Sequence, residues 1–489
     1  MGVETHSSGV HEGVQGHRER SVPAFRIALP LPERRALLIV GDTLLVNGVV
    51  LVALWLWAKV GGEPFDSDFI RVRWYWFPVL SIAWWCLAWL GDLYDIPMAS
   101  RRIEVSGRVG GVILGLGVIY LVVYFLSPRN ALPRVFFLYF SILALICLVL
   151  WRWTYATIFA LPLLRRRLLI VGAGWAGQTL AQVLSAQDSV GYQVVGFVDD
   201  DPAKQGEAAV GLPVLGLGTN LVDIVQTHQV DKVVVAVTHD WQGELFQALM
   251  DCRSRGTDIA RMPELYEQLT RRVPVEHVDK GWVLGALNGF SALGRLERAV
   301  RRLLDLVLGL LGSLGLGIAL PLVALAVRLD DNGPIFYTQV RSGLGGRPFR
   351  AIKFRTMRPD AEEDGHAQWA RENDDRVTRV GRLLRKIRLD ELPQVINVLR
   401  GEMSIVGPRP ERPEFIADLE KQIPFYRTRL VVKPGLTGWA QIHYGYGNSV
   451  RDALIKLQYD LYYIRHRSLW LDLYIVFKTV GVVLSGIGM

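Results

Sequence analysis

The stretch Leu389-Asp390-Glu391-Leu392-Pro393-Gln394, with Gly401 to Pro410 close behind it, indicates most about fold and chemistry in this chain. Two adjacent carboxylates follow a basic run, and a rigid Pro408-Arg409-Pro410 comes next. Carboxylates set among cations suit chemistry on phosphates, because one can attack phosphorus, one can hold a metal, and arginines can neutralise the oxygens. For an isolated Asp-Glu pair, a salt-bridged surface helix would be the alternative.

Composition indicates a membrane protein with several domains. The chain has 489 residues, which is too many for one core, and 51% of them are hydrophobic, with 15 Trp. A net charge of +8 in such a protein marks cytoplasmic loops and attraction to anionic lipid or phosphorylated substrates. We see no nucleic-acid-binding module and expect no nucleic acid partner. The three cysteines lack the spacing of metal or redox sites.

The first third of the chain is expected to be a tail (1–33) and a four-helix transmembrane domain (34–164). The tail is polar, rich in Gly and Ser, and typical of disorder. Four apolar segments are each expected to cross a membrane core of ~30 Å, which needs about 20 helical residues: Ala36–Ala58, Trp74–Leu90, Val109–Leu126 and Val135–Ala160. Basic residues around Arg101 and after Arg165 place the middle loop and the rest of the chain in the cytoplasm.

A Rossmann-like cytoplasmic module is expected over residues 165–290. An apolar strand, Leu168–Val171, runs into a glycine-rich turn containing Gly172, Gly174 and Gly177, and a later strand ends at Asp199. These residues are the candidates for binding a nucleotide cofactor. The acidic residue comes later than the usual spacing of about 20, which favours the alternative of a Rossmann fold kept for structure or regulation.

The apolar run Leu303–Val327 is long enough to span, yet basic residues flank both of its ends. The charge rule therefore predicts a re-entrant helix, which enters one leaflet, bends at Pro321 and returns. It opens a C-terminal α-rich catalytic domain over residues 295–489. The last apolar segment, Leu469–Ile487, contains charged residues and favours an interfacial amphipathic helix.

Further candidates for phosphate contacts surround the acidic pair. A basic, glycine-containing segment includes Arg341, Lys353 and Arg355. Arg385 precedes Asp390 by about one and a half helical turns, so both are predicted to lie on one side of the site. Pro408 and Pro410 hold Arg409 on a stiff turn, as a phosphate clamp requires.

Taken in order, these motifs resemble the bacterial polyprenyl-phosphate hexose-1-phosphate transferases. These monotopic phosphoglycosyl transferases start exopolysaccharide, capsule and O-antigen synthesis. The resemblance covers about Arg298 to the C-terminus, and the spans with the Rossmann-like module resemble the family's long-chain members. One departure is Leu320-Pro321, where the family often has Ser-Pro in its re-entrant helix.

The resemblance implies transfer of a hexose-1-phosphate, with glucose as our choice, from a UDP-sugar to undecaprenyl phosphate, releasing UMP. It implies Asp390 as nucleophile and Glu391 as a Mg²⁺ ligand. Arg385 and Arg409 are expected to clamp phosphates, with Lys353, Arg355, Arg341, Pro408 and Pro410 around the substrate. The protein would lie in the bacterial inner membrane with its catalytic domain on the cytoplasmic face.

Two alternatives come from other classes. One is a membrane-bound NAD-dependent enzyme that modifies nucleotide sugars through the Gly172–Gly177 turn. The other is a membrane scaffold that senses a nucleotide there. A homo-oligomer is compatible with all three.

Overall fold

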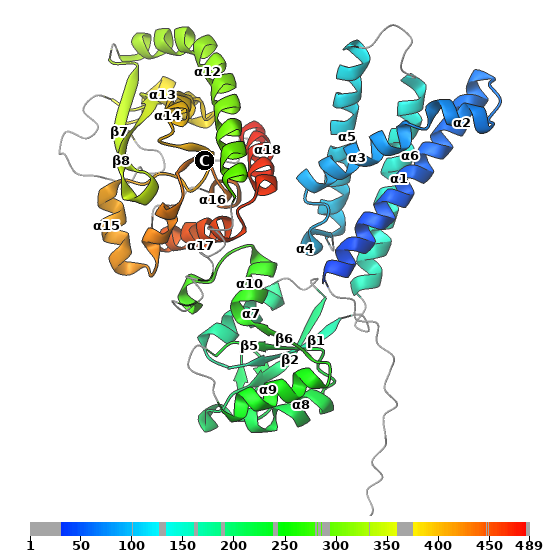
Figure 1. Ribbon diagram of the computed structural model, residues 1–489, viewed down its shortest axis with the longest axis vertical. Helices are drawn as coiled ribbons and strands as arrows, with labels where there is room; N and C mark the ends of the chain where they lie inside the picture. The colour runs from blue at the N-terminus through cyan, green and yellow to red at the C-terminus, as the bar shows by residue number, and fades with distance from the viewer. Residues whose placement is uncertain are drawn as a thin grey trace, which may run out of the picture.

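The computed structural model describes residues 31–99, 101–126, 134–160, 165–186, 191–237, 243–278, 281, 285, 294–331, 333–358, 375–445, 447 and 449–485. The tail expected over residues 1–33 lies almost wholly outside these ranges. The helices and strands form three groups, which Figure 1 shows as a bundle of long helices, a sheet-containing module and a C-terminal module.

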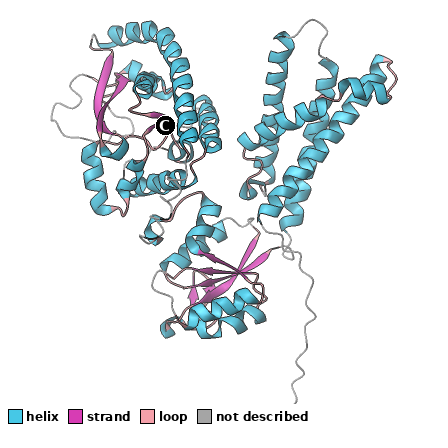
Figure 2. Cartoon of the chain, in the orientation of Figure 1, coloured by secondary structure: helices cyan, strands magenta, loops and turns pink. Residues whose placement is uncertain are grey.

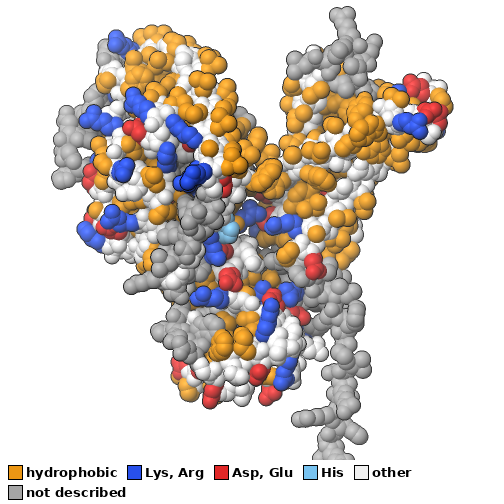
Figure 3. Space-filling view, viewed as in Figure 1, with side chains coloured by type: hydrophobic (Ala, Val, Ile, Leu, Met, Phe, Trp, Pro, Cys, Tyr) orange, Lys and Arg blue, Asp and Glu red, His pale blue; other side chains and the backbone are white. Residues whose placement is uncertain are grey.

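Three of the four expected spans are long helices, namely α1 (Leu31–Gly61), α5 (Arg102–Leu126) and α6 (Arg134–Ala160). Together with α12 (Arg295–Asp331), they are the described helices that are long and apolar enough to cross a membrane. Their apolar side chains face outward over much of the surface, as Figure 3 shows for the bundle. A helix that exposes such residues requires an apolar surrounding, and these findings fit a membrane protein.

The second expected span, Trp74–Leu90, differs from its prediction. The chain turns at Trp74 and Tyr75, after α2 (Ser67–Arg73), and the apolar helix α3 covers only Trp76–Leu90. Its 15 residues rise only about 22 Å, which is less than the ~30 Å of a hydrocarbon core. The short helix α4 (Ile96–Ala99) follows it.

A buried ion pair joins the first and last helices of the bundle. Arg152 Nη2 lies 2.5 Å from Asp42 Oδ2, and both side chains are fully buried. Trp84 Nε1 also donates to this carboxylate, at 3.2 Å, and Arg152 donates to Leu93 O. Because an unpaired charge among apolar helices is costly, this network ties α1, α6 and the end of α3 together.

The middle module contains the expected parallel sheet. Its strands are β1 (Arg166–Val171), β2 (Tyr192–Val198), β5 (Lys232–Val235) and β6 (Asp258–Arg261), in the order β2-β1-β5-β6. Figure 2 shows this sheet with helices around it. Its main helices are α7 (Trp175–Ala186), α8 (Leu221–Thr227), α9 (Glu244–Ser254) and α10 (Met262–Thr270). The strands form two hydrophobic clusters, one on each face, as both faces of a parallel sheet require.

The C-terminal module is α-rich with short strands. Its strands are β7 (Phe336–Ser342) paired antiparallel with β8 (Pro348–Phe354), and β9 (Ser404–Val406) paired parallel with β10 (Gly435–Thr437). Its helices are α13 (Arg379–Lys386), α14 (Val395–Arg400), α15 (Pro413–Gln422), α16 (Trp439–His443), α17 (Val450–His466) and α18 (Leu469–Ser485). Two 3₁₀ helices matter for the site, η6 (Leu389–Gln394) and η7 (Tyr426–Val431).

Helix α12 contacts this C-terminal module at both of its ends. Near its start, Arg302 donates to Val398 O at 2.8 Å and to Leu399 O at 2.7 Å, and Asp305 accepts from Ser404 Oγ at 2.8 Å. Near its end, Asp330 accepts from Val380 N at 3.0 Å. Figure 1 shows the helix bending between its two ends. Pro321, inside it, supplies a cause, since proline removes one helical hydrogen bond and crowds the preceding turn.

The last helix, α18, joins the module to the bundle. Asp92, at the turn after α3, accepts hydrogen bonds from Tyr474 and from Lys478 Nζ. Asp472, also on α18, pairs with Arg301 at the start of α12 and accepts from Tyr463. The charged residues of this apolar helix therefore have partners inside the protein, rather than lying only at a lipid surface.

Candidate active site

Side-chain hydrogen bonds bring the acidic pair against the β7–β8 hairpin. Asn397 of α14 accepts from Ile352 N at 3.1 Å and donates to Arg350 O at 2.8 Å. Since α14 follows η6 directly, these bonds hold the Asp390-Glu391 turn over strand β8. Lys353, on the same strand, reaches Glu391 as a result.

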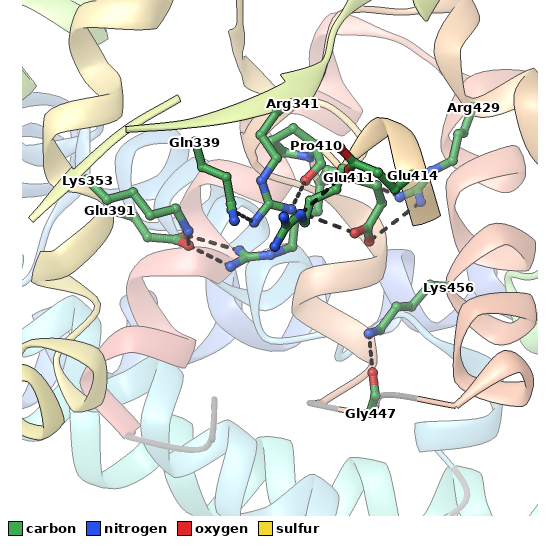
Figure 4. A network of polar contacts seen from close by, with 12 residues as sticks. Gln339, Arg341, Lys353, Glu391, Pro410, Glu411, Glu414, Arg429, Gly447 and Lys456 are labelled. Atoms are coloured by element: carbon green, nitrogen blue, oxygen red, sulfur yellow. Dashed lines mark hydrogen bonds and ion pairs between the residues drawn. The ribbon is translucent and has the colours of Figure 1, made fainter. Parts of the chain in front are cut away.

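Glu391 lies between two positively charged side chains, those of Lys353 and Arg409. Lys353 Nζ lies 2.5 Å from its Oε1, and Arg409 contacts both of its oxygens, at 2.5 and 3.0 Å. Figure 4 shows Lys353 and Glu391 pointing toward each other. Burial alone would raise the pKa of Glu391, but Arg409 and Lys353 outweigh it and hold that pKa well below its usual range. Glu391 is therefore ionised at neutral pH.

Asp390 has the opposite environment. It is 8% exposed, and its Oδ1 is buried without a hydrogen-bond partner among the described residues. Burial and the neighbouring Glu391 raise its pKa, against the opposing effects of Lys353, Arg409 and Arg385. Burial and the charge of Glu391 therefore outweigh the cations around Asp390. When the environment shifts the pKa values of two adjacent carboxylates in opposite directions, the two residues typically have different chemical roles.

The prediction that Arg385 and Asp390 lie on one side of the site used helical spacing, but the two residues belong to separate helices. Helix α13 ends at Lys386, and Arg388 adopts a left-handed conformation with φ 58° before η6 begins. Arg385 donates from Nε to Thr356 Oγ1 at 2.9 Å. Its charge still lowers the pKa of Asp390, so the two residues belong to one neighbourhood despite the break.

The Pro408–Pro410 turn places Arg409 in this site. Hydrogen bonds to the backbone carbonyl oxygens of the turn hold it in position. Gly435 N donates to Pro408 O at 2.9 Å, and Arg341 Nη1 donates to Pro410 O at 3.1 Å. A small hollow that opens to solvent has Arg341, Lys353, Glu391, Gln394, Arg409 and Pro410 among its lining residues. Five of these six are residues that the sequence predicted; a phosphate entering here would meet several cations at once.

Arg355, which the sequence also predicted near the substrate, is not among the residues that line this hollow. Its side chain is buried and donates from Nε to Pro334 O at 2.6 Å, next to Gly333. It therefore anchors the segment between α12 and β7. Sequence reasoning also missed Gln394, whose buried Nε2 has no partner among the described residues, and the buried Arg429 with Asp460. Gln394 ends the Leu389–Gln394 stretch without being singled out there, whereas no local motif marks Arg429 or Asp460, which only the fold brings near Arg409.

A metal site made of protein ligands alone does not occur in the described part of the chain, where no three His, Cys, Asp or Glu side chains gather. Mg²⁺ is commonly held by one or two carboxylates and by substrate phosphates. The adjacent carboxylates of Asp390 and Glu391 fit that second arrangement.

The glycine-rich turn of the middle module has a local partner. Gly172 adopts φ 106°, and a Cβ on Gly177 would lie 1.9 Å from Gly172 O, so close strand–helix packing requires both glycines. Asp199 Oδ2 accepts from Ala173 N at 2.7 Å, and Lys204 Nζ lies 3.2 Å from the same oxygen. The carboxylate expected to face a ribose is thus engaged with its own turn, whereas the space beside Gly174 is open.

Comparison with known proteins gives two family matches, a bacterial sugar transferase model over residues 296–486 and a CoA-binding domain over residues 90–263. A UDP-glucose:undecaprenyl-phosphate glucose-1-phosphate transferase of Xanthomonas campestris pv. campestris is 34% identical over 65% of this chain and 67% of that protein. The chain belongs to the bacterial sugar transferase family.

Two further proteins that are similar to this chain are named for different sugars. A UDP-glucose:undecaprenyl-phosphate glucose-1-phosphate transferase of Caulobacter vibrioides is 44% identical over 38% of this chain and 70% of that protein. A UDP-N-acetylgalactosamine-undecaprenyl-phosphate N-acetylgalactosaminephosphotransferase of Aeromonas hydrophila is 40% identical over 51% of this chain. The match spans 57% of the Aeromonas protein's length. The acidic pair and the Arg409 turn both lie inside the matched transferase segment.

Proposed function

We propose that this sugar transferase moves a hexose-1-phosphate, with glucose as the first choice, from a UDP-sugar to undecaprenyl phosphate and releases UMP. The observation that carries the proposal is the contrast between Glu391, an anion fixed by Lys353 and Arg409, and Asp390, buried beside it with one oxygen that has no hydrogen-bond partner in the described part of the chain. One carboxylate is engaged and the other is available to react.

Asp390 acts as the nucleophile in this proposal. Its carboxylate oxygen attacks the sugar-side phosphorus, and the bond from that phosphorus to the bridging oxygen breaks, so that UMP leaves with the electron pair. The sugar-phosphate is then held as an acyl phosphate on Asp390. A phosphate oxygen of undecaprenyl phosphate attacks the same phosphorus, releases the carboxylate and gives the lipid diphosphate sugar.

The cations around the hollow orient the diphosphate and stabilise the charge that develops on it. Arg409 and Lys353 face the hollow from two different elements, and Arg341 adds a third positive group. Burial and Glu391 raise the pKa of Asp390, and the positive charge of Arg385, with Lys353 and Arg409, opposes that rise and so favours the reactive anion. Glu391 would hold a Mg²⁺ together with the substrate's phosphates by exchanging one of its ion pairs, and the bound ion would neutralise charge on the diphosphate.

Helix α12 supports a proposal for how the protein lies in the membrane. We propose that it enters the membrane and returns to the same side, because both of its ends contact one module and its middle exposes large apolar side chains such as Leu314, Ile318 and Leu322. The basic residues that flank it favour the cytoplasmic face of the bacterial inner membrane. Lipid acceptor and cytosolic UDP-sugar would then meet at the hollow. The glycine-rich turn is kept as a separate nucleotide-binding proposal, with space beside Gly174 as its support.

The test omits the lipid acceptor. The wild-type enzyme in nanodiscs is mixed with each member of a UDP-sugar panel, and UMP is measured per enzyme molecule. We expect a stoichiometric burst of UMP and a sugar-phosphate adduct on the peptide containing Asp390. Asp390→Asn should lower the burst and turnover by about a thousandfold or more, because it keeps the shape and removes the nucleophile. UMP that appears only with acceptor present, without an adduct, would instead indicate direct transfer.

A further inference from the structure

Arg429 is a buried arginine behind the Arg409 turn. It lies on η7, its side chain is 3% exposed, and it contacts Tyr426 of the same 3₁₀ helix and groups from two other places in the fold. Its Nη1 donates to Tyr426 Oη at 2.7 Å, its Nη2 donates to Arg409 O at 3.1 Å, and its Nη2 lies 2.8 Å from Asp460 Oδ2 on α17. Glu411 lies 3.7 Å from Nη1, and Figure 4 shows Arg429 reaching toward it.

The Arg409 turn needs such a donor because of its prolines. Pro408 and Pro410 have no backbone N–H, so this segment cannot be fixed through those two amides. Its carbonyls are used instead, since Gly435 N binds Pro408 O, Arg429 binds Arg409 O and Arg341 binds Pro410 O. Three consecutive carbonyls thus each have a donor from a different element.

Arg429 holds the backbone of the residue whose side chain carries the chemistry. Arg409 places both guanidinium nitrogens on the Glu391 carboxylate, and a bidentate contact of this kind depends strongly on direction. A rotation of the Arg409 peptide would move that fork away from Glu391 and from the hollow. A buried ion pair such as Arg429–Asp460 is poor evidence of stabilisation, because desolvation offsets much of its attraction.

We propose that Arg429, held by Asp460, is a positioning residue for sugar-phosphate transfer, which fixes the Arg409 peptide so that the guanidinium meets Glu391 and the diphosphate. The inference rests on the proposed function for its kinetic part. Lysine at position 429 would keep the charge beside Asp460, but its single ammonium cannot serve Tyr426, Arg409 and Asp460 with the same fixed fork.

The kinetic test is a double-mutant cycle on UMP release with the full chain in nanodiscs. Arg429→Lys should lower kcat by about tenfold to a hundredfold, as expected when a catalytic group is slightly misplaced. The same change made on an Arg409→Lys background should cost much less, because the group that it positions is already altered. Arg427→Lys is the matched control, since Arg427 lies on the same 3₁₀ helix and its one ion pair among the described residues is with Glu420, on a solvent-exposed arginine side chain. Equal losses on both backgrounds would overturn the proposal.

Hydrogen–deuterium exchange without substrate gives a readout that does not depend on activity. Arg429→Lys should speed exchange in the peptide covering residues 404–411, where Gly407 N is bonded to Thr437 O, and Arg427→Lys should not. Asp460→Asn, which removes the anion beside Arg429, should act in the same direction. Unchanged exchange in both variants overturns the positioning role. If the wild type releases no UMP from any UDP-sugar, the proposed function fails, while the exchange comparison still decides this inference.

Discussion

Replacing Gly312 by alanine should displace the helix that follows the acidic pair. A Cβ built on Gly312 of α12 would lie 2.8 Å from Val395 Cγ1 of α14, closer than side chains normally approach. Alanine gains about 1 kcal/mol of helix propensity over glycine, whereas overpacking a close contact costs about 1–3 kcal/mol. The neighbouring Gly315 has nothing within 4 Å of such a Cβ, so Gly315→Ala gains the propensity without the clash. The two variants should therefore differ by about 1–3 kcal/mol of stability.

The effect on catalysis follows from the order of the elements. Because η6 leads directly into α14, a shift of Val395 moves Asp390 and Glu391 relative to Lys353 and Arg409. We expect Gly312→Ala to lower initial UMP release by about tenfold and Gly315→Ala to leave it unchanged. Thermal unfolding and UMP release would be measured for both variants in the same nanodiscs. Equal behaviour of the two variants in both assays would refute the view that α12 positions the acidic pair.

Two predictions concern contacts between modules. Burial raises the pKa of Glu267 to about 7 despite its pair with Arg465, so the folded state takes up a proton that the unfolded chain binds only near pH 4.5. Stability from this group should rise as pH falls from about 7 to about 4.5, by about 3 kcal/mol at most, and Glu267→Gln should flatten that part of the unfolding profile. Asp92→Asn should lower the unfolding temperature through a loss of about 1–3 kcal/mol, because Lys478 then lacks its anion while asparagine still tolerates the left-handed φ. Asp68→Asn, in an exposed pair, is its control, and an equal shift in both would contradict the docking role of Asp92.

The local patterns of the sequence predicted much of the fold. The apolar strands and the glycine-rich turn between strand and helix were enough to predict the Rossmann-like sheet. Both signals are local, since a strand is marked by short-range hydrophobic pattern and the turn by the positive φ that Gly172 adopts. Length and hydropathy predicted three long apolar helices. The second expected span is an apolar helix that is shorter than predicted, because hydropathy does not register the turn at Trp74 and Tyr75.

The site was predictable in its members but not in its pairings. Motif order brought attention to Lys353, Glu391 and Arg409, yet their ion pairs join residues 38 and 18 positions apart, which depend on how β8, η6 and the turn pack. Helical spacing failed for Arg385 and Asp390 because a single left-handed residue, Arg388, separates their helices. Arg429 lies outside every motif, and its role follows only from the carbonyl that it reaches.

Contacts at the two ends of α12 have a practical consequence for anyone who would trim this enzyme. A fragment that begins after Asp331 would lose the cap that Arg302 places on α14 and the acceptor that Asp305 offers to β9. It would also uncover Val395, which is 2% exposed and stands one residue beyond the acidic turn. Helix α12 thus covers part of the core of the catalytic module. A water-soluble version would have to keep the helix and replace its exposed apolar side chains, rather than delete it.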